Sequence, residues 1–130
     1  MRLLLDTHVL LWALAKPERI RADARMAIED PNNDVLFSAA SIWEIAIKAS
    51  LNRIDFQVSP AEITTAALES GFTELPVHSG AAAHTAKLPM HHRDPFDRLL
   101  IAQAITEPAV LYTADAQLEA YSELVHRISS

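Results

Sequence analysis

Acidic residues stand directly after or within apolar segments of this 130-residue chain. Asp6 follows three consecutive leucines, Glu44 lies in a nearly all-apolar segment, and Asp115 comes just after the run AVLYT. Asp94 and Asp97 enclose a proline and a phenylalanine in the segment DPFD. Carboxylate oxygens suit Mg²⁺ and Mn²⁺, and carboxylates held close together repel one another unless a cation lies among them. A shared site of these acids would support metal-assisted hydrolysis of a phosphodiester, in which the metal generates hydroxide and neutralises the transition state.

Three of the acids also have a purely structural interpretation as helix N-caps. Asp6, Asp94 and Asp115 each precede a predicted helix, where a side-chain oxygen can accept hydrogen bonds from free backbone N–H groups. A proline follows Asp94, and proline is favoured at the first helical position. At the first of these helices Thr7 can act as the cap by itself, which would leave the carboxylate of Asp6 free to point into a crevice.

The other two acids have different structural alternatives. Glu44 fits a capping box with Ser41 and an i,i+4 ion pair with Lys48. The capping box is the weaker of the two, because Ser38 offers an equally good cap one turn earlier. Asp97 falls at the third position after the cap, where the helix dipole favours an acid, but it also borders the apolar face of its helix. Each acid alone can be structural, whereas their joint placement favours a shared site.

The composition excludes several classes of site. The chain has two glycines and no cysteine, and it contains no phosphate-binding glycine loop and no GxSxG segment. Disulfides, thiolate zinc sites and cysteine nucleophiles are therefore excluded, and four histidines between residues 78 and 92 have no convincing zinc-site spacing. The longest apolar run, residues 9–15, is far shorter than the ~20 residues that span a bilayer. No signal peptide is predicted, so we expect a soluble, cytoplasmic chain with no membrane association.

The net charge of −6 argues against non-specific binding to nucleic acid, which normally needs a basic surface. With the negative charges of the five acids assigned to one metal site, the rest of the chain carries a net charge of only −1. One or two divalent cations would then make the cleft itself nearly neutral or positive. The overall charge therefore does not decide the substrate.

Strands and helices are predicted to alternate along one domain, residues 1–130. The predicted strands are residues 2–5, 34–38, 73–75, 109–113 and, at an edge, 124–128. The predicted helices are residues 7–15, 20–30, 39–51, 60–69, 79–88, 95–106 and 116–121. This order indicates an α/β fold with βαβ units and a short parallel sheet flanked by helices on both faces. Ligands bind beyond the carboxyl ends of such strands, which is where Asp6 and Asp115 stand.

The segments LLLDTHVLLW, SAASIWEIAIK, HHRDPFDRLLIAQA and LYTADAQLEAY resemble the PIN-domain toxins called VapC. The resemblance runs from the first strand nearly to the last. It implies a PIN domain, a magnesium-dependent endoribonuclease that cuts RNA, and inhibition by a small VapB-type antitoxin. It also implies a homodimer and a toxin–antitoxin hetero-oligomer. The alternatives are a PIN nuclease of RNA processing or DNA repair without an antitoxin, and a non-catalytic protein-binding module.

Matched residue by residue, the acids of the family fall on Asp6, Glu44, Asp97 and Asp115. Asp97 is chosen because DRLLIAQA aligns with the acid-led helix of the family without a gap, while Asp94 competes for the same position. The resemblance implies that Asp6, Asp97 and Asp115 bind Mg²⁺, with Mn²⁺ as the alternative, directly or through water. Glu44 then completes the metal site or orients the attacking water. The candidates for contacts with RNA phosphates are Arg98, Arg93, His92 and Lys48.

Two tryptophans and their helices lead to a further expectation. Trp12 and Trp43 lie in apolar helical stretches, so both are predicted to be core residues rather than platforms for stacking bases. The segments 9–15 and 42–49 nevertheless carry more apolar surface than a small sheet can bury. Part of that surface is expected to face another chain.

Overall fold

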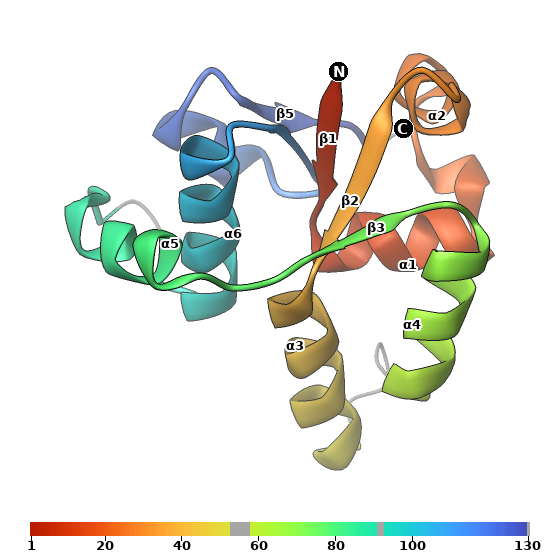
Figure 1. Cartoon of the computed structure of the whole chain (residues 1–130), viewed down its shortest axis with the longest axis horizontal. Coiled ribbons are helices and arrows are strands. Elements are labelled where there is room, and N and C mark those ends of the chain that lie inside the picture. The colour runs from red at the N-terminus through yellow and green to blue at the C-terminus, as the bar shows by residue number, and fades with distance from the viewer. Residues whose placement is uncertain (53–57, 91–92, 130) are drawn as a thin grey trace.

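Five short parallel strands form the centre of the protein (Figure 1). A computed structural model describes residues 1–52, 58–90 and 93–129. The strands are β1 (Arg2–Leu5), β2 (Asp34–Ser38), β3 (Thr73–Leu75), β4 (Val110–Thr113) and β5 (Val125–Arg127). Their order in the sheet is β3-β2-β1-β4-β5, and each neighbouring pair is parallel. β2 and β3 therefore lie on one side of β1, and β4 and β5 lie on the other side. The order of the strands reverses between β1 and β4, which makes this boundary the switch point of the sheet.

Helices cover both faces of this sheet (Figure 1). The helices are α1 (Thr7–Ala15), α2 (Ala22–Glu29), α3 (Ala39–Ser50), α4 (Pro60–Glu69), α5 (Ser79–His84) and α6 (Pro95–Thr106), with short 3₁₀ helices η1 (Pro17–Arg19), η3 (Thr85–Lys87) and η4 (Ala116–Tyr121). Leu3 and Leu5 of β1 face a core shared with α1, α2 and α4, whereas Leu4 faces the opposite core, with α6 and η4. This alternation follows from the two-residue period of a strand, and it explains why β1 is a continuous leucine run.

The crossover connections fix which helix ends lie at the carboxyl edge of the sheet. α1 and α3 begin directly after β1 and β2, so their first turns lie there. α6 precedes β4 and runs antiparallel to it, and its N-terminal turn therefore lies at the same edge. The N-terminal turns of α1, α3 and α6 therefore lie at the same edge of the sheet as the carboxyl ends of β1 and β4.

Most predicted elements are confirmed, several of them to the residue, including helices 7–15, 60–69 and 95–106. The helix predicted at residues 20–30 starts only at Ala22, because Ile20 is extended and forms an isolated bridge with Ser129. The segment 79–88 divides into α5 and η3, and residues 116–121 form a 3₁₀ helix. Within the described residues, no helix is long and apolar enough to cross a bilayer.

The prediction that both tryptophans are core residues is wrong for Trp43, which is 62% exposed. Its ring lies in a T-shaped contact with that of Phe96 from α6, at a centroid distance of 5.3 Å. Trp12 is half-buried and lies beside Arg19, whose guanidinium carbon is 6.0 Å from the ring centroid. The helical pattern placed both rings next to the core but did not determine how much of each ring the neighbouring helices cover.

Candidate active site

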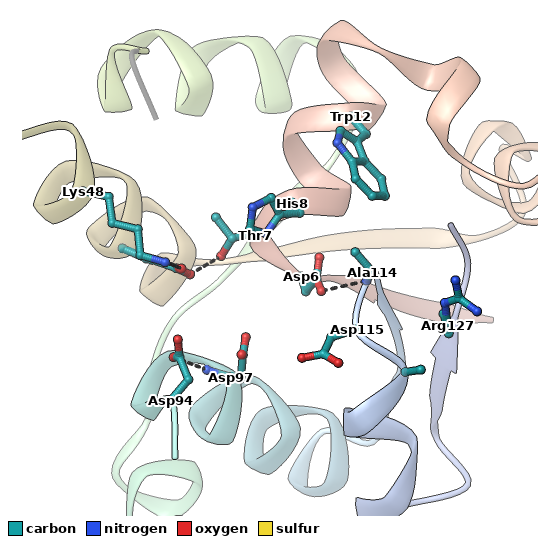
Figure 2. A pocket seen from close by; sticks show the side chains of 12 residues that line it. Asp6, Thr7, His8, Trp12, Lys48, Asp94, Asp97, Ala114, Asp115 and Arg127 are labelled. Carbon is teal, nitrogen blue, oxygen red and sulfur yellow. Dashed lines mark hydrogen bonds and ion pairs between the residues drawn. The ribbon is translucent and has the colours of Figure 1, made fainter. Parts of the chain in front are cut away.

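A cleft of about 620 Å³ opens at the carboxyl edge of the sheet, beside the β1/β4 switch point (Figure 2). All five acids singled out in the sequence line it: Asp6, Glu44, Asp94, Asp97 and Asp115. Its wall also includes side chains of other types, among them Thr7, His8, Trp12, Lys48 and Arg127. The predicted convergence of the acids is confirmed as a placement, since they come from β1, α3, the start of α6 and the end of β4.

Asp6 is almost fully buried at 5% exposure and accepts three hydrogen bonds. Val9 N–H donates to Oδ1 at 2.8 Å, while Thr113 Oγ1 and Ala114 N–H donate to Oδ2 at 2.6 and 3.1 Å. Burial raises the pKa of this carboxyl above its ordinary value, although the three hydrogen bonds and the charge of His8 act in the opposite direction. Its environment therefore disfavours the negative charge until a cation comes near.

The expectation that Thr7 caps the first helix is wrong. Asp6 is itself the N-cap of α1, and Thr7 is the first residue inside the helix. The hydroxyl of Thr7 is used elsewhere, as a 2.6 Å donor to Glu44 Oε1. Capping therefore does not compete with a role in the cleft, because Oδ1 of Asp6 carries one hydrogen bond and keeps a second lone pair for another partner.

Asp115 is tied to Asp6 through Thr113. The hydroxyl of Thr113 donates to Asp6 Oδ2 and accepts the Asp115 backbone N–H at 3.0 Å. Oδ1 of Asp115 caps η4 by accepting Gln117 N–H at 2.9 Å. The carboxylate projects into the same space as those of Asp6 and Asp97 (Figure 2). One threonine thus fixes the ends of both central strands relative to each other.

The two acids of the DPFD segment take different positions in α6. Asp94 is the N-cap of α6, and its Oδ1 accepts the backbone N–H groups of Phe96 and Asp97 at 2.8 and 3.2 Å. Asp97 lies in the first turn of the helix, and its side chain rises from α6 into the cleft between Asp94 and Asp115 (Figure 2). The geometry therefore favours Asp94 as the cap and Asp97 as the acid that faces the centre of the cleft.

Glu44 lies on the α3 wall of the cleft and is 3% exposed. Its two oxygens have separate partners, Thr7 Oγ1 on Oε1 at 2.6 Å and Lys48 Nζ on Oε2 at 2.5 Å. A 3.0 Å hydrogen bond joins the hydroxyls of Thr7 and Ser41. The predicted ion pair with Lys48 is therefore confirmed, and the capping box is not formed because Ser38 is the N-cap of α3.

The donor set suits a hard divalent cation bound with its water. All five acids offer oxygen, the ligand that Mg²⁺ and Mn²⁺ prefer. Among the residues that the structure describes, no three acids or histidines lie close enough together to hold one ion directly. Mg²⁺ commonly keeps several waters and binds through one or two carboxylates, so a hydrated ion fits this arrangement.

Of the residues considered for contacts with phosphates, three are described by the structure, and Lys48 is the one of these three that lines this cleft. Arg93 and Arg98 line a neighbouring pocket, and His92 lies outside the described residues. The guanidinium of Arg98 donates to the carbonyl oxygens of Thr85 and Pro89 at 2.9 and 3.0 Å. Its role in the structure is to connect α6 to the segment before it.

Sequence reasoning missed Thr113 and Arg127. Thr113 is fully buried and polar at the end of a strand, and that combination is a signal that could have identified it. Arg127 of β5 reaches the cleft only because β5 lies next to β4 in the sheet. Neither its spacing nor its surroundings in the sequence could indicate this.

Comparison with known proteins places the chain in a family. The PIN domain matches residues 3–124. The chain is 32% identical over 119 residues to Ribonuclease VapC22 of Mycobacterium tuberculosis (strain ATCC 25618 / H37Rv), a match that covers 91% of this chain and 90% of the relative.

Solved structures share the fold at lower identity. VapBC2 from Rickettsia felis, bound to a DNA fragment from their promoter, matches with a TM-score of 0.74 and 16% identity over 99% of this chain and 100% of that one. FitAcB from Neisseria gonorrhoeae matches with a TM-score of 0.60 and 20% identity over 96% of each chain. VapBC-1 from nontypeable Haemophilus influenzae has a TM-score of 0.60 and 19% identity over 92% of this chain and 91% of that one. The chain therefore belongs to the PIN-domain family and, within it, to the VapC-type ribonuclease toxins.

Proposed function

We propose that this chain is an endoribonuclease that hydrolyses RNA phosphodiester bonds with Mg²⁺, or Mn²⁺, bound in the acidic cleft. The observation that carries the proposal is that acids from four separate segments line one cleft at the switch point of the sheet. Nucleases of this family are metal-dependent. The proposed substrate is intracellular RNA, so we expect the chain to work in the cytoplasm as one domain, residues 1–130.

We assign the catalytic set to four acids: Asp6, Glu44, Asp97 and Asp115. Asp6, Asp97 and Asp115 would hold the metal, one or two of them directly and the rest through its water, because their side chains share the centre of the cleft. When bound, the metal supplies an activated water and neutralises charge that develops on the scissile phosphate. Glu44 belongs to the same set, either as a further ligand or as the group that orients the attacking water.

The chain's own residues prepare this site before a metal binds. Thr113 holds Asp6 and the backbone of Asp115 in fixed positions, so little rearrangement is needed when a cation arrives. Asp94 holds the first turn of α6 and thereby the position of Asp97. The wall also contains Arg127, whose positive charge suits an RNA phosphate.

The test of this activity is incubation of the purified protein with total RNA, with Mg²⁺ or with EDTA, followed by mapping of new RNA ends. We expect discrete cleavage sites that appear only with the metal. Cut ends of equal number in both samples would contradict a metal-dependent reaction.

The partner that we propose is a VapB-type antitoxin. The solved structures with this fold include the VapBC2 and VapBC-1 proteins. An apolar helix of the antitoxin would cover exposed apolar surface near α1 and α3, and a cationic residue would pair with the acids of the cleft. Trp43, an exposed aromatic residue on α3, supports a partner chain on this side. A homodimer and a hetero-oligomer with the antitoxin are part of this proposal.

The antitoxin proposal is tested by co-purification with the product of the neighbouring gene. The arginines and lysines of its tail are then replaced one at a time, and inhibition of RNA cleavage is measured for each variant. We expect at least one such variant to lose inhibition while it still binds. If every variant suppresses cleavage fully, no cationic residue blocks the cleft. If no partner is found, the alternative of a PIN nuclease without an antitoxin gains support.

A further inference from the structure

We propose that the cleft binds one divalent cation, because Lys48 takes the place of a second one beside Glu44. The inference rests on the proposed function, since it concerns the same cleft, and it narrows the role of Glu44. Glu44 would stay on the ammonium group while the metal binds among Asp6, Asp97 and Asp115. Lys48 would then be a positioning residue that keeps Glu44 away from the metal.

The first support is that both oxygens of Glu44 already have partners. Lys48 Nζ is 2.5 Å from Oε2, and Thr7 Oγ1 is 2.6 Å from Oε1. The carboxylate is buried, and the Lys48 side chain is itself only 19% exposed. Among the described residues, no buried side-chain oxygen or nitrogen lacks a hydrogen-bond partner. The negative charge of Glu44 is therefore compensated without a metal.

The second support is the contrast between Glu44 and Asp6. The donors to Asp6 are two backbone N–H groups and one hydroxyl, all of them uncharged. A salt bridge to a lysine or arginine exists at Glu44 and is absent at Asp6 within the part of the chain that the structure describes. A cation entering the cleft gains more at Asp6, because the charge of His8 that acts on this carboxyl comes without a salt bridge of the kind that holds Glu44.

The third support is that the Glu44–Lys48 pair is built into a rigid element. The two residues are one turn apart on α3, an i,i+4 spacing that keeps their side chains together. Thr7 from α1 holds the other oxygen, and the Ser41 hydroxyl in turn holds Thr7. A divalent ion bound directly to Glu44 would lie close to the ammonium and be repelled by it, so it would have to displace Lys48 first.

The test is a count of Mn²⁺ ions bound per chain after EDTA treatment, by titration calorimetry and by electron paramagnetic resonance of the free ion. We expect one ion for the wild type. Lys48→Met has a similar length without the charge, and we expect it to gain a second ion through Glu44. Lys48→Arg keeps the charge and should keep one ion.

The double variant Lys48→Met with Glu44→Gln replaces the pair by neutral side chains and is the matched control. We expect it to bind one ion with an affinity within about twofold of the wild type, because neither side chain contacts that ion and their charges cancel. This variant also tests the inference if Lys48→Met alone does not fold, as judged by circular dichroism.

Three outcomes would overturn the inference: two ions on the wild type, one ion on folded Lys48→Met, or a tenfold weaker affinity of the double variant. None of these results depends on RNA cleavage. Failure of the proposed function would instead appear as RNA that stays intact with Mg²⁺. The two failures are therefore distinguishable.

Discussion

At the scale of single residues, the acids of this cleft combine a structural and a chemical role. Asp6, Asp94 and Asp115 are all N-caps, as their positions before helices suggested. The same positions lie at the carboxyl edge of the sheet, so the caps also line the cleft. A carboxylate has about four lone-pair sites, which is enough for a backbone N–H and a further partner. One aspartate can therefore cap a helix and bind a metal ion at the same time.

The buried carboxyl of Asp6 gives a prediction about pH. Its pKa is raised by burial, so the folded chain holds this proton more tightly than the unfolded chain does. Without metal, the contribution of Asp6 to the free energy of unfolding is therefore greatest at acidic pH and is lost as pH rises through the raised pKa. A metal ion needs the charged form, so the gain in Tm from Mg²⁺ should be small at acidic pH and increase as pH rises.

The measurement is Tm against pH in EDTA and in Mg²⁺, for the wild type and for Asp6→Asn. The variant has no proton to lose at this position, so its metal-dependent gain should be smaller and depend less on pH. A wild-type gain in Tm that does not change from acidic to mildly alkaline pH would contradict the assignment of Asp6 to the metal.

At the scale of elements, the position of Asp97 depends on how α6 is held. Arg98, the next residue, donates to the carbonyls of Thr85 and Pro89 and to Tyr121 Oη at 3.3 Å. These bonds connect the first turn of α6 with the preceding segment and with the end of η4, the 3₁₀ helix that Asp115 caps. Arg98 thus links the elements that carry two of the proposed metal-binding acids.

Replacing this half-buried arginine should destabilise the fold more than replacing an exposed one. Lysine keeps the charge but lacks the planar fork of donors, so Arg98→Lys should lower the free energy of unfolding by about 1–3 kcal/mol. Arg93→Lys is the matched control, because Arg93 is exposed nearby. Denaturant unfolding of both variants checks this, and equal midpoints would show that the bonds of Arg98 contribute little.

The elements also show which features the sequence could predict. Strands and helices were predictable because local sequence signals mark them, such as the leucines of β1 and the proline after Asp94. Gly71 is another such signal: it follows the C-cap of α4 with a φ of 89°, a conformation that favours glycine. The wrong predictions concern residues whose conformation depends on contacts with distant parts of the chain. Ile20 is extended because it pairs with Ser129, and no local pattern contains that information.

The candidate site also has features that the sequence predicts and features that depend on distant contacts. The convergence of the acids followed from topology, because parallel strands end at one edge of the sheet. The hydrogen bonds that orient these acids could not be predicted from topology, because their partners are far apart in the sequence. Thr113 and Asp6 are 107 positions apart, and Thr7 and Glu44 are 37 positions apart. The sequence therefore predicted which acids gather but not which neighbour holds each one.

At the scale of the whole molecule, a negatively charged chain has to bind a negatively charged polymer. The net charge is −6, and five acids line the cleft, three of which are proposed to hold metal. Bound cations change the sign of the local charge without changing the rest of the surface. Metal should consequently stabilise the fold as well as permit the reaction.

Divalent metal should raise the Tm of the wild type, because it binds the assembled cleft and not the unfolded chain. At a free ion concentration a hundredfold above Kd, the gain in the free energy of unfolding is about 2.7 kcal/mol. Asp6→Ala should lose most of this gain. Thermal unfolding with Mg²⁺, Mn²⁺ or EDTA measures it, and equal shifts in the two proteins would show that Asp6 belongs to no specific metal site.

The acids that face the middle of this cleft are proposed to carry out RNA cleavage, and a comparison of the two acids of DPFD tests this. RNA cleavage rates are measured with Mg²⁺ for the wild type, Asp97→Asn and Asp94→Asn. Asparagine caps helices nearly as well as aspartate, so Asp94→Asn should keep both the fold and nearly the wild-type rate. Asp97→Asn should be slower by about a hundredfold or more, with a fold that is intact or more stable because a crowded negative charge is removed. Wild-type cleavage by Asp97→Asn, with loss of cleavage in Asp94→Asn, would contradict this account of the site.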